Sequence, residues 1–184
     1  GTANSYTLEG TLYGRGAGET LLLPLLTPPF QQSSTARVTH SGGHVLGRWN
    51  HILPKGGDWM LHAYYDRVRQ ETQALQENVD TIDLDFQHHF KISGRQDWIW
   101  GLGYRTIRED FKGSFLITIP SDTEHHFNTF LQDEISLVPY RLELIPGLKV
   151  EHEPHRGWNA QPSLRMLWTP SKDQAVWAAV SQAL

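Results

Sequence analysis

The chain has 184 residues, no cysteine, a formal net charge of −4 and an apolar fraction of 39%. No apolar run approaches the roughly 18 residues that a membrane-spanning helix needs, and the slight acidic excess gives no reason to expect a nucleic-acid partner. The lack of cysteine excludes disulfides and thiolate metal sites. Length and composition therefore fit one large β domain without helical membrane spans.

The first half of the chain contains four segments in which apolar residues recur at every second position, as in a strand with one apolar face. We predict strands over residues 5–13, 39–53, 58–69 and 81–90. Between the first two lies a Gly- and Pro-rich stretch, residues 14–36, and we predict a long loop there. Residues 54–57 are predicted as a tight turn and residues 70–78 as a polar connection.

The second half continues with the same period of two. We predict five more strands, over residues 98–108, 125–138, 142–151, 160–168 and 175–184. In the segment 142–151 apolar residues fill the even positions, while Glu143, Lys149 and Glu151 stand among the positions between them. A turn centred near Arg95 would place Asp85 opposite Arg105, as a cross-strand pair of opposite charge.

The connections between these strands alternate in length. Residues 14–36, 70–78 and 109–124 are long, residues 54–57, 93–97, 139–141 and 170–174 are short, and the brief segment 152–158 is the exception. Aromatic residues gather near the short connections, namely Trp49, Trp59, Phe90, Trp98, Tyr140, Trp168 and Trp177. Short turns on one side, long loops on the other and an aromatic girdle are typical of outer-membrane barrels. The sequence therefore predicts an all-β fold, an antiparallel up-and-down transmembrane β-barrel portion of about nine strands.

A small soluble β-barrel or sandwich that binds an apolar ligand is the alternative interpretation, because an inward-facing apolar side gives the same alternation. Two features favour the membrane barrel. The predicted strands have about ten residues or more, where soluble strands average about five or six, and the side opposite the apolar one is charged along most of its length. Solubility of the chain without detergent would favour the alternative.

Several strings in the sequence resemble consecutive barrel strands of TonB-dependent outer-membrane receptors, in order and at fitting spacing. They are GRWNHIL, AYYDRVRQE, IDLDFQHHF, WGLGYR, FLQDEISLVPYRLELIPGLKVEHE, QPSLRMLWTP and WAAVSQA, between Ser41 and Leu184. The resemblance implies a location in the outer membrane of a Gram-negative cell and uptake of a ferric siderophore or a similar scarce ligand. It also implies a plug domain and the TonB system as partners. Because no TonB box, plug or closing strands are recognisable, we expect residues 1–184 to be a single segment from the middle of such a barrel.

The polar positions of a large barrel line its lumen. On the predicted register this wall contains Arg48, Asp85, Gln132, Glu134, Lys149, Glu151 and Arg165, together with His62, Tyr64, Asp66, Asp83, Gln87 and Arg105. Most of these groups are expected to neutralise one another and to stiffen the wall or contact the plug. Ligand-binding residues are expected near the long loops, which points to Tyr64, Arg105 and Arg108.

Metal binding and catalysis find no support in the sequence. The adjacent pairs His88–His89 and His125–His126 would each point to opposite faces of a strand. No HExxH or GxSxG spacing is present, so we predict no metal site, no cofactor and no enzyme. The expected partners are outer-membrane lipid, a plug, TonB and a small-molecule ligand such as a metal chelate. An isolated segment is expected to self-associate through its open strand edges.

Overall fold

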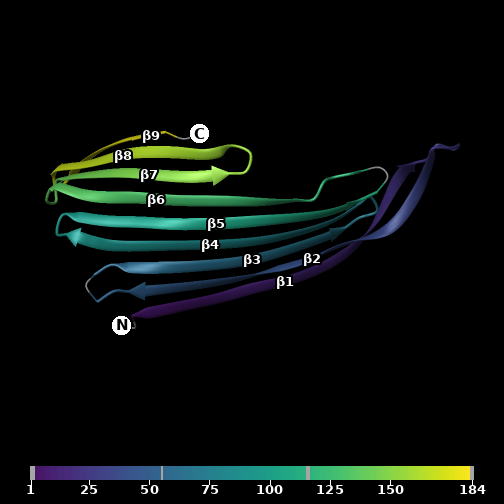
Figure 1. The fold of residues 1–184 in the computed structure, drawn as a ribbon, viewed down its shortest axis with the longest axis horizontal. Helices are drawn as coiled ribbons and strands as arrows, with labels where there is room; N and C mark the ends of the chain where they lie inside the picture. Colours follow the sequence, from purple (N-terminus) through teal and green to yellow (C-terminus); the bar gives the residue numbers. More distant parts are fainter. Residues whose placement is uncertain (1–2, 55, 115–116, 183–184) are drawn as a thin grey trace.

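Nine antiparallel strands form one sheet in sequence order, so that each strand pairs with its neighbours along the chain (Figure 1). This computed structural model describes residues 3–54, 56–114 and 117–182. The strands are β1 (Asn4–Pro24), β2 (Gln31–Ile52), β3 (Asp58–Glu71), β4 (Leu75–Ser93), β5 (Gln96–Gly113), β6 (Asp122–Val138), β7 (Leu142–Glu153), β8 (Gly157–Ser171) and β9 (Gln174–Ser181). The predicted all-β, up-and-down fold of nine strands is confirmed. Within the described residues, no helix has the length and apolar content that crossing a membrane requires.

The hairpin of β1 and β2 is much longer than the sequence indicated. Its strands pair along their whole length, so the loop predicted over residues 14–36 is wrong and only residues 25–30 connect the strands. Pro24 occupies the last pair of the ladder, where a missing N–H interrupts nothing. Gly16 leaves room for Arg37, whose Nε would lie 2.6 Å from a Cβ at that position. The hairpin therefore projects beyond the other strands (Figure 1).

The connection between β3 and β4 is also shorter than predicted. The predicted polar connection over residues 70–78 is wrong, because β3 ends at Glu71 and β4 begins at Leu75. The Thr72 hydroxyl closes this turn by donating to the backbone oxygen of Leu75 at 3.0 Å and accepting from the backbone nitrogen of Leu75 at 3.0 Å. A hydroxyl that bonds to the backbone in this way stabilises a short turn.

The predicted loop over residues 109–124 is right only in its centre. Strand β5 extends to Gly113 and β6 begins at Asp122, so both ends of the predicted loop belong to strands. Residues 114 and 117–121 connect them, and residues 115 and 116 lie outside the described part of the chain. The predicted alternation between short and long connections is consequently weaker in the structure.

The turn between β4 and β5 shifts the predicted pairing by two residues. Arg105 lies opposite Asp83, so the predicted pairing of Asp85 with Arg105 is wrong. One position of the shift comes from the turn, which is centred between Gly94 and Arg95 because Ser93 pairs with Gln96. The other comes from a bulge between Lys91 and Ser93, which inserts one extra residue. The shift by two keeps each side chain on its predicted face.

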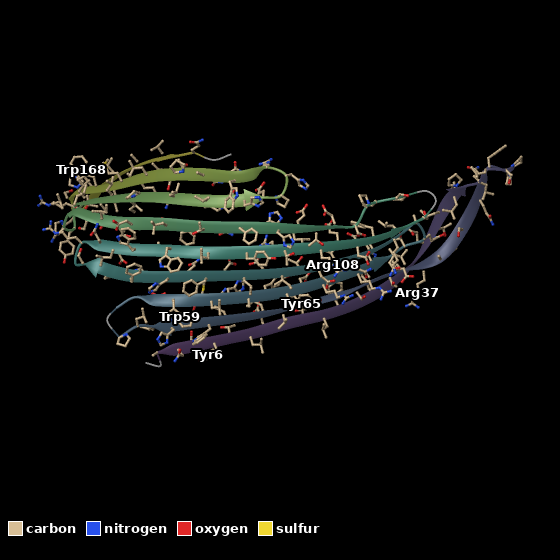
Figure 2. The ribbon with its side chains drawn as sticks, viewed as in Figure 1. Tyr6, Arg37, Trp59, Tyr65, Arg108 and Trp168 are labelled. Atoms are coloured by element: carbon tan, nitrogen blue, oxygen red, sulfur yellow. The ribbon has the colours of Figure 1, made fainter. Side chains whose placement is uncertain are left out.

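The sheet has one apolar and one polar face, and no second layer covers either of them in the described residues (Figure 2). Val38, 7% exposed, is the one buried hydrophobic residue in this part of the chain. On the apolar face Leu148 is 45% exposed and Leu164 is 41% exposed. A soluble sandwich or small barrel would bury such residues against its own chain, so the described residues do not form the alternative fold.

Candidate functional site

The register aligns the polar positions of neighbouring strands in rows across one face, named here the polar face. One row runs from Arg48 on β2 through Asp85 on β4 to Glu151 on β7. The next row contains Tyr64 on β3 and Arg105 on β5. The other predicted wall residues on this face are Gln132, Glu134, Lys149 and Arg165. The structure therefore brings together all of the predicted wall residues and two of the three predicted ligand-binding residues.

Arg105 and Asp83 form the ion pair of the polar face with the most buried carboxylate among the described residues. The Nε–H of Arg105 donates to Oδ2 of Asp83 across the β4–β5 pair. Asp83 is only 6% exposed, whereas the Arg105 side chain is 57% exposed. A buried carboxylate needs such a partner, since an unpaired charge away from water is costly. The guanidinium is thereby fixed at one edge and keeps its remaining N–H donors open to the space above the face.

A second polar network lies on β7 and β8. Lys149 forms an ion pair with Glu151, and the Nε2 of Gln161 donates to Oε1 of Glu151 at 2.6 Å. Lys149 and Gln161 are direct cross-strand partners, whereas Glu151 lies two positions farther along β7 on the same face. These contacts neutralise the wall locally and connect the two strands.

Two clusters of histidine and carboxylate groups have the spacing of metal ligands. Their members are His62, Asp83 and Asp85 in the wall, and Asp122, Glu124 and His155 near the long connections, with ligand atoms within 4.8 Å of one another. Imidazole and carboxylate are ligands that suit Zn²⁺. In the first cluster the guanidinium of Arg105 already neutralises Asp83 and would repel a cation. The absence of a metal site stays a prediction.

Arg108 lies apart from the other predicted ligand-binding residues. It pairs with Asp80 on β4, which in turn pairs with Arg67 on β3, and all three belong to the face opposite Tyr64 and Arg105. Figure 2 shows Arg108 and Tyr65 toward the end of the sheet where the long hairpin projects. The structure therefore separates Arg108 from the polar wall.

Asp133 is a polar residue on the apolar face that was not among the predicted site residues. It is 9% exposed and pairs across the ladder with Trp98. Its Oδ2 accepts from Nε2 of Gln96 at 3.2 Å, while its Oδ1 and the Nε1 of Trp98 are buried without a hydrogen-bond partner. The signal in the sequence is the adjacent pair Asp133–Glu134, because neighbouring residues in a strand face opposite sides and one of them had to enter the apolar face.

The apolar face carries aromatic side chains from the end with the short turns to the middle of the strands. At the end with the short turns, Trp49 stacks with Tyr6 at 5.7 Å and meets Trp59 edge-on at 4.4 Å between ring centroids. Nearer the long connections, Tyr104 and Phe127 lie 4.9 Å apart. Figure 2 shows Tyr6, Trp59 and Trp168 toward the end with the short turns. An uncovered apolar face with aromatic residues gathered at the end with the short turns is typical of a barrel surface that faces lipid.

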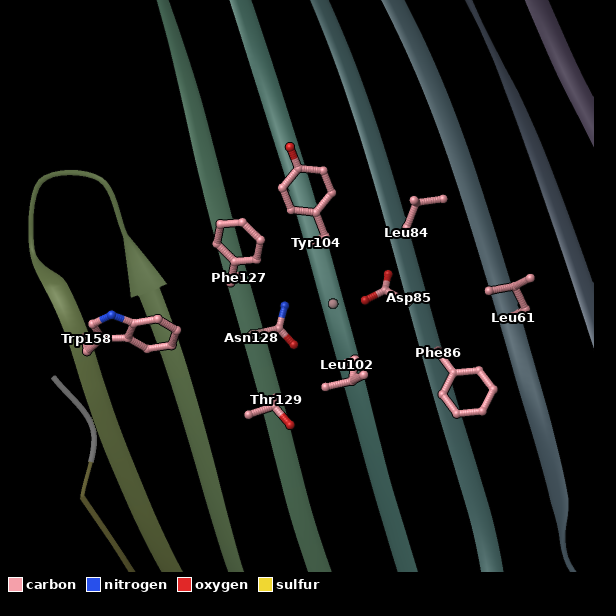
Figure 3. A pocket seen from close by; sticks show the side chains of 11 residues that line it. Leu61, Leu84, Asp85, Phe86, Leu102, Tyr104, Phe127, Asn128, Thr129 and Trp158 are labelled. Atoms are coloured by element: carbon pink, nitrogen blue, oxygen red, sulfur yellow. The ribbon is translucent and has the colours of Figure 1, made fainter.

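A shallow hollow of about 430 Å³ lies across β4, β5 and β6 (Figure 3). Leu84, Leu102 and Phe127 are among its lining residues, and Trp158 on β8 closes one side of the view. Asp85 and Asn128, which also line it, belong to the polar face, and the rest of the lining is mostly apolar, so the hollow suits hydrocarbon.

A single-layer antiparallel sheet with one uncovered apolar face, one polar face and aromatic residues near its short turns has the features of a transmembrane β-barrel wall. The chain belongs to the TonB-dependent receptors, because the family model described as TonB dependent receptor-like, beta-barrel matches residues 3–184. The structure is similar to the crystal structure of the siderophore receptor PirA from Pseudomonas aeruginosa, with a TM-score of 0.59 and 18% sequence identity. That match covers 97% of this chain and 36% of the PirA chain, and at this identity it shows the fold. No curated protein sequence matches the chain.

Membership in this family confirms the predicted resemblance. Receptors of this family are located in the outer membrane and transport ligands. The chain spans about a third of the length of PirA, since the match covers 36% of that protein. Its nine strands therefore correspond to a portion of such a barrel.

Proposed function

We propose that residues 1–184 form part of the barrel wall of an outer-membrane receptor that imports a ferric siderophore or a similar scarce ligand with energy supplied through TonB. In this proposal the end with the short turns faces the periplasm and the long β1–β2 hairpin faces the exterior. A plug domain elsewhere in the receptor would fill the lumen. The observation that carries the proposal is the sheet itself, whose apolar face is uncovered while its opposite face is lined with ion pairs.

The polar face supports a role in ligand passage through Tyr64 and Arg105. Both lie in one row, and the row includes the buried carboxylate of Asp83 that holds the guanidinium. A fixed and half-exposed guanidinium presents several donors to an anionic or oxygen-rich chelate. The Tyr64 hydroxyl offers one more hydrogen-bonding group on the same face. We propose that these two residues contact the ligand or the plug.

Uptake of labelled ferric siderophores by cells that carry the full-length receptor tests this proposal. We expect Arg105→Ala combined with Tyr64→Phe to lower uptake at least several-fold. Arg165→Ala is the matched control, because it removes the same charge from the same face nearer the short turns. Equal uptake by the double variant, the control and the native receptor would refute the role of the two residues. Uptake that persists without TonB would refute the energy coupling.

A further inference from the structure

A group of side chains that ligate metals in other proteins lies on the polar face at the start of β6. Asp122, Glu124 and His126 occupy alternate positions of this strand, so they belong to one side of the sheet. His155 joins them from the turn between β7 and β8, residues 154–156. Asp122, Glu124 and His155 each offer one ligand atom, and these atoms lie within 4.8 Å of one another. The four residues are named here the rim cluster.

The register places the rim cluster beyond the membrane-spanning part of the sheet. β7 pairs with β6 only from Phe127 onward, so the first residues of β6 extend past the end of β7 (Figure 1). Glu124 pairs with Ile107, which lies nine positions beyond Trp98 on β5, and this is about 30 Å along a strand. The apolar band of a barrel wall is about 25 Å tall. Measured from Trp98, the cluster therefore lies in water at the mouth of the lumen.

The spacing of two donors fits a tetrahedral metal site. Zn²⁺ holds imidazole nitrogen at about 2.0–2.1 Å and carboxylate oxygen at about 2.0–2.2 Å, which places neighbouring ligand atoms about 3.4 Å apart. The Nε2 of His155 and the Oε1 of Glu124 are 3.4 Å apart, which is long for a hydrogen bond. Asp122 is exposed, so its carboxylate can reach the same centre by rotation of the side chain. The three residues supply three ligands and leave a fourth position to water.

His126 holds Glu124 in place from the other side. Its Nε2 lies 3.0 Å from Oε2 of Glu124, the oxygen that is not paired with His155. A carboxylate that ligates a metal is usually fixed by a hydrogen bond of this kind. The side chains of His126 and Glu124 are both 31% exposed, whereas that of His155 is 77% exposed. Glu124 is therefore the fixed ligand, and Asp122 and His155 are the ligands that close on the ion.

The carboxylates of the rim cluster lack a cation of the chain itself. In the described residues Glu124 forms ion pairs with histidines alone, and Asp122 forms none. By contrast, the buried carboxylate of Asp83 meets the guanidinium of Arg105. Two carboxylates this close repel each other, and imidazole ligates metals in its neutral form. A divalent cation would neutralise the two carboxylates and use the imidazole as well.

We propose that the rim cluster binds Zn²⁺ or a similar divalent transition-metal ion. Asp122, Glu124 and His155 are its ligands, His126 positions Glu124, and the bound ion fixes the β7–β8 turn against the start of β6. For these residues the proposal replaces the prediction of no metal site, which rested on spacing along the chain, whereas His155 meets β6 only in the fold. The location at the outer mouth rests on the orientation in the proposed function, but the site itself depends on neither ligand uptake nor TonB.

Zinc binding by the purified full-length receptor tests the inference, with Zn²⁺ as the probe and a chromophoric chelator as competitor. We expect E124Q/H155A to bind one zinc ion fewer per receptor, because two of three ligands are removed. H126A keeps all three ligands, and we expect it to bind this ion about 10–100-fold more weakly. D58N/H89A is the matched control, because it removes a carboxylate and an imidazole that lie 2.9 Å apart at the short turns. It is expected to bind zinc like the native receptor.

A spin label at Arg156→Cys gives a second readout, because zinc would fix the turn that contains this residue. We expect Zn²⁺ to slow the motion of the label in the receptor and to leave it unchanged when E124Q/H155A is added. Heat-modifiable mobility on gels checks that each variant is folded. Zinc held elsewhere in the receptor is common to all variants and cancels in the difference.

Three results would overturn the inference. They are equal zinc stoichiometry in the native and E124Q/H155A receptors, the same loss in the control, and displacement of the ion by an equal concentration of Ca²⁺, which prefers oxygen ligands alone. Neither siderophore nor TonB is present in these measurements. Failure here therefore leaves the uptake proposal standing, and failure of uptake leaves zinc binding standing.

Discussion

An arginine placed in the middle of the apolar band tests whether that band contacts lipid or water. Leu102 on β5 is 52% exposed and lies four positions beyond Trp98 and six before Arg108 on the same face. It therefore lies near the middle of the band. Arginine on the lipid face of a barrel costs about 2–4 kcal/mol at the midplane and about 0–1 kcal/mol near an interface. We expect Leu102→Arg to lower the free energy of unfolding by about 2–4 kcal/mol.

Two matched variants separate depth from face. Ile82→Arg adds the same charge on the same face two positions from Asp80, where the apolar residues of β4 end, and we expect a loss of about 0–1 kcal/mol. Gln87→Arg adds it on the polar face, one position along β4 from the cross-strand partner of Leu102, and we expect a change within about 0.5 kcal/mol. Guanidinium unfolding of the full-length receptor in phospholipid vesicles, followed by tryptophan fluorescence, gives the three values. Equal small changes in all three variants would refute the reasoning, because a face in water tolerates arginine.

Three further substitutions test the Arg105–Asp83 ion pair, the buried carboxylate of Asp133 and the closely packed glycine Gly43. Arg105→Ala leaves Asp83 buried without its partner. We expect the free energy of unfolding to fall by about 1–2 kcal/mol, a value discounted for the exposed guanidinium. If adding Asp83→Asn causes no larger loss, the pair is supported, whereas additive losses would contradict it. Asp133→Asn removes a poorly satisfied carboxylate from the apolar face, and unfolding in vesicles should show a gain of about 1 kcal/mol or no change, whereas a clear loss would show that the charge is needed. Gly43→Val forces a side chain against Leu12, and thermal unfolding should show a stability loss of about 1–3 kcal/mol. A native-like midpoint of unfolding would contradict this expectation.

The alternation of apolar and polar residues predicted the strands, because this alternation alone determines which residues share a face. Inside strands, glycine and proline misled the prediction. Gly16 and Pro24 indicated a loop, yet Gly16 makes room for Arg37 and Pro24 ends the ladder. The bulge near Lys91 could not be predicted, since an irregular pair depends on the partner strand and leaves no pattern in one segment.

The sequence predicted which face of the sheet carries the site residues, but not which of these residues lie in the same cross-strand row. Tyr64 and Arg105 share a face and a row, and alternation gives the face whereas only the register gives the row. Arg108 lies on the opposite face from Arg105 for a reason visible in the sequence. It is three positions from Arg105, and an odd separation in a strand means opposite faces.

The direction of alternate side chains along β4 is the most direct test, and the lack of cysteine in the chain makes it practicable. Single cysteines at Ile82, Asp83, Leu84, Asp85 and Phe86 in the receptor would carry spin labels in phospholipid vesicles, and collision with dissolved oxygen would be measured at each. We predict high oxygen accessibility at Ile82, Leu84 and Phe86 and low accessibility at Asp83 and Asp85. The reverse order, or one uniform value at all five positions, would contradict a wall whose apolar face meets lipid.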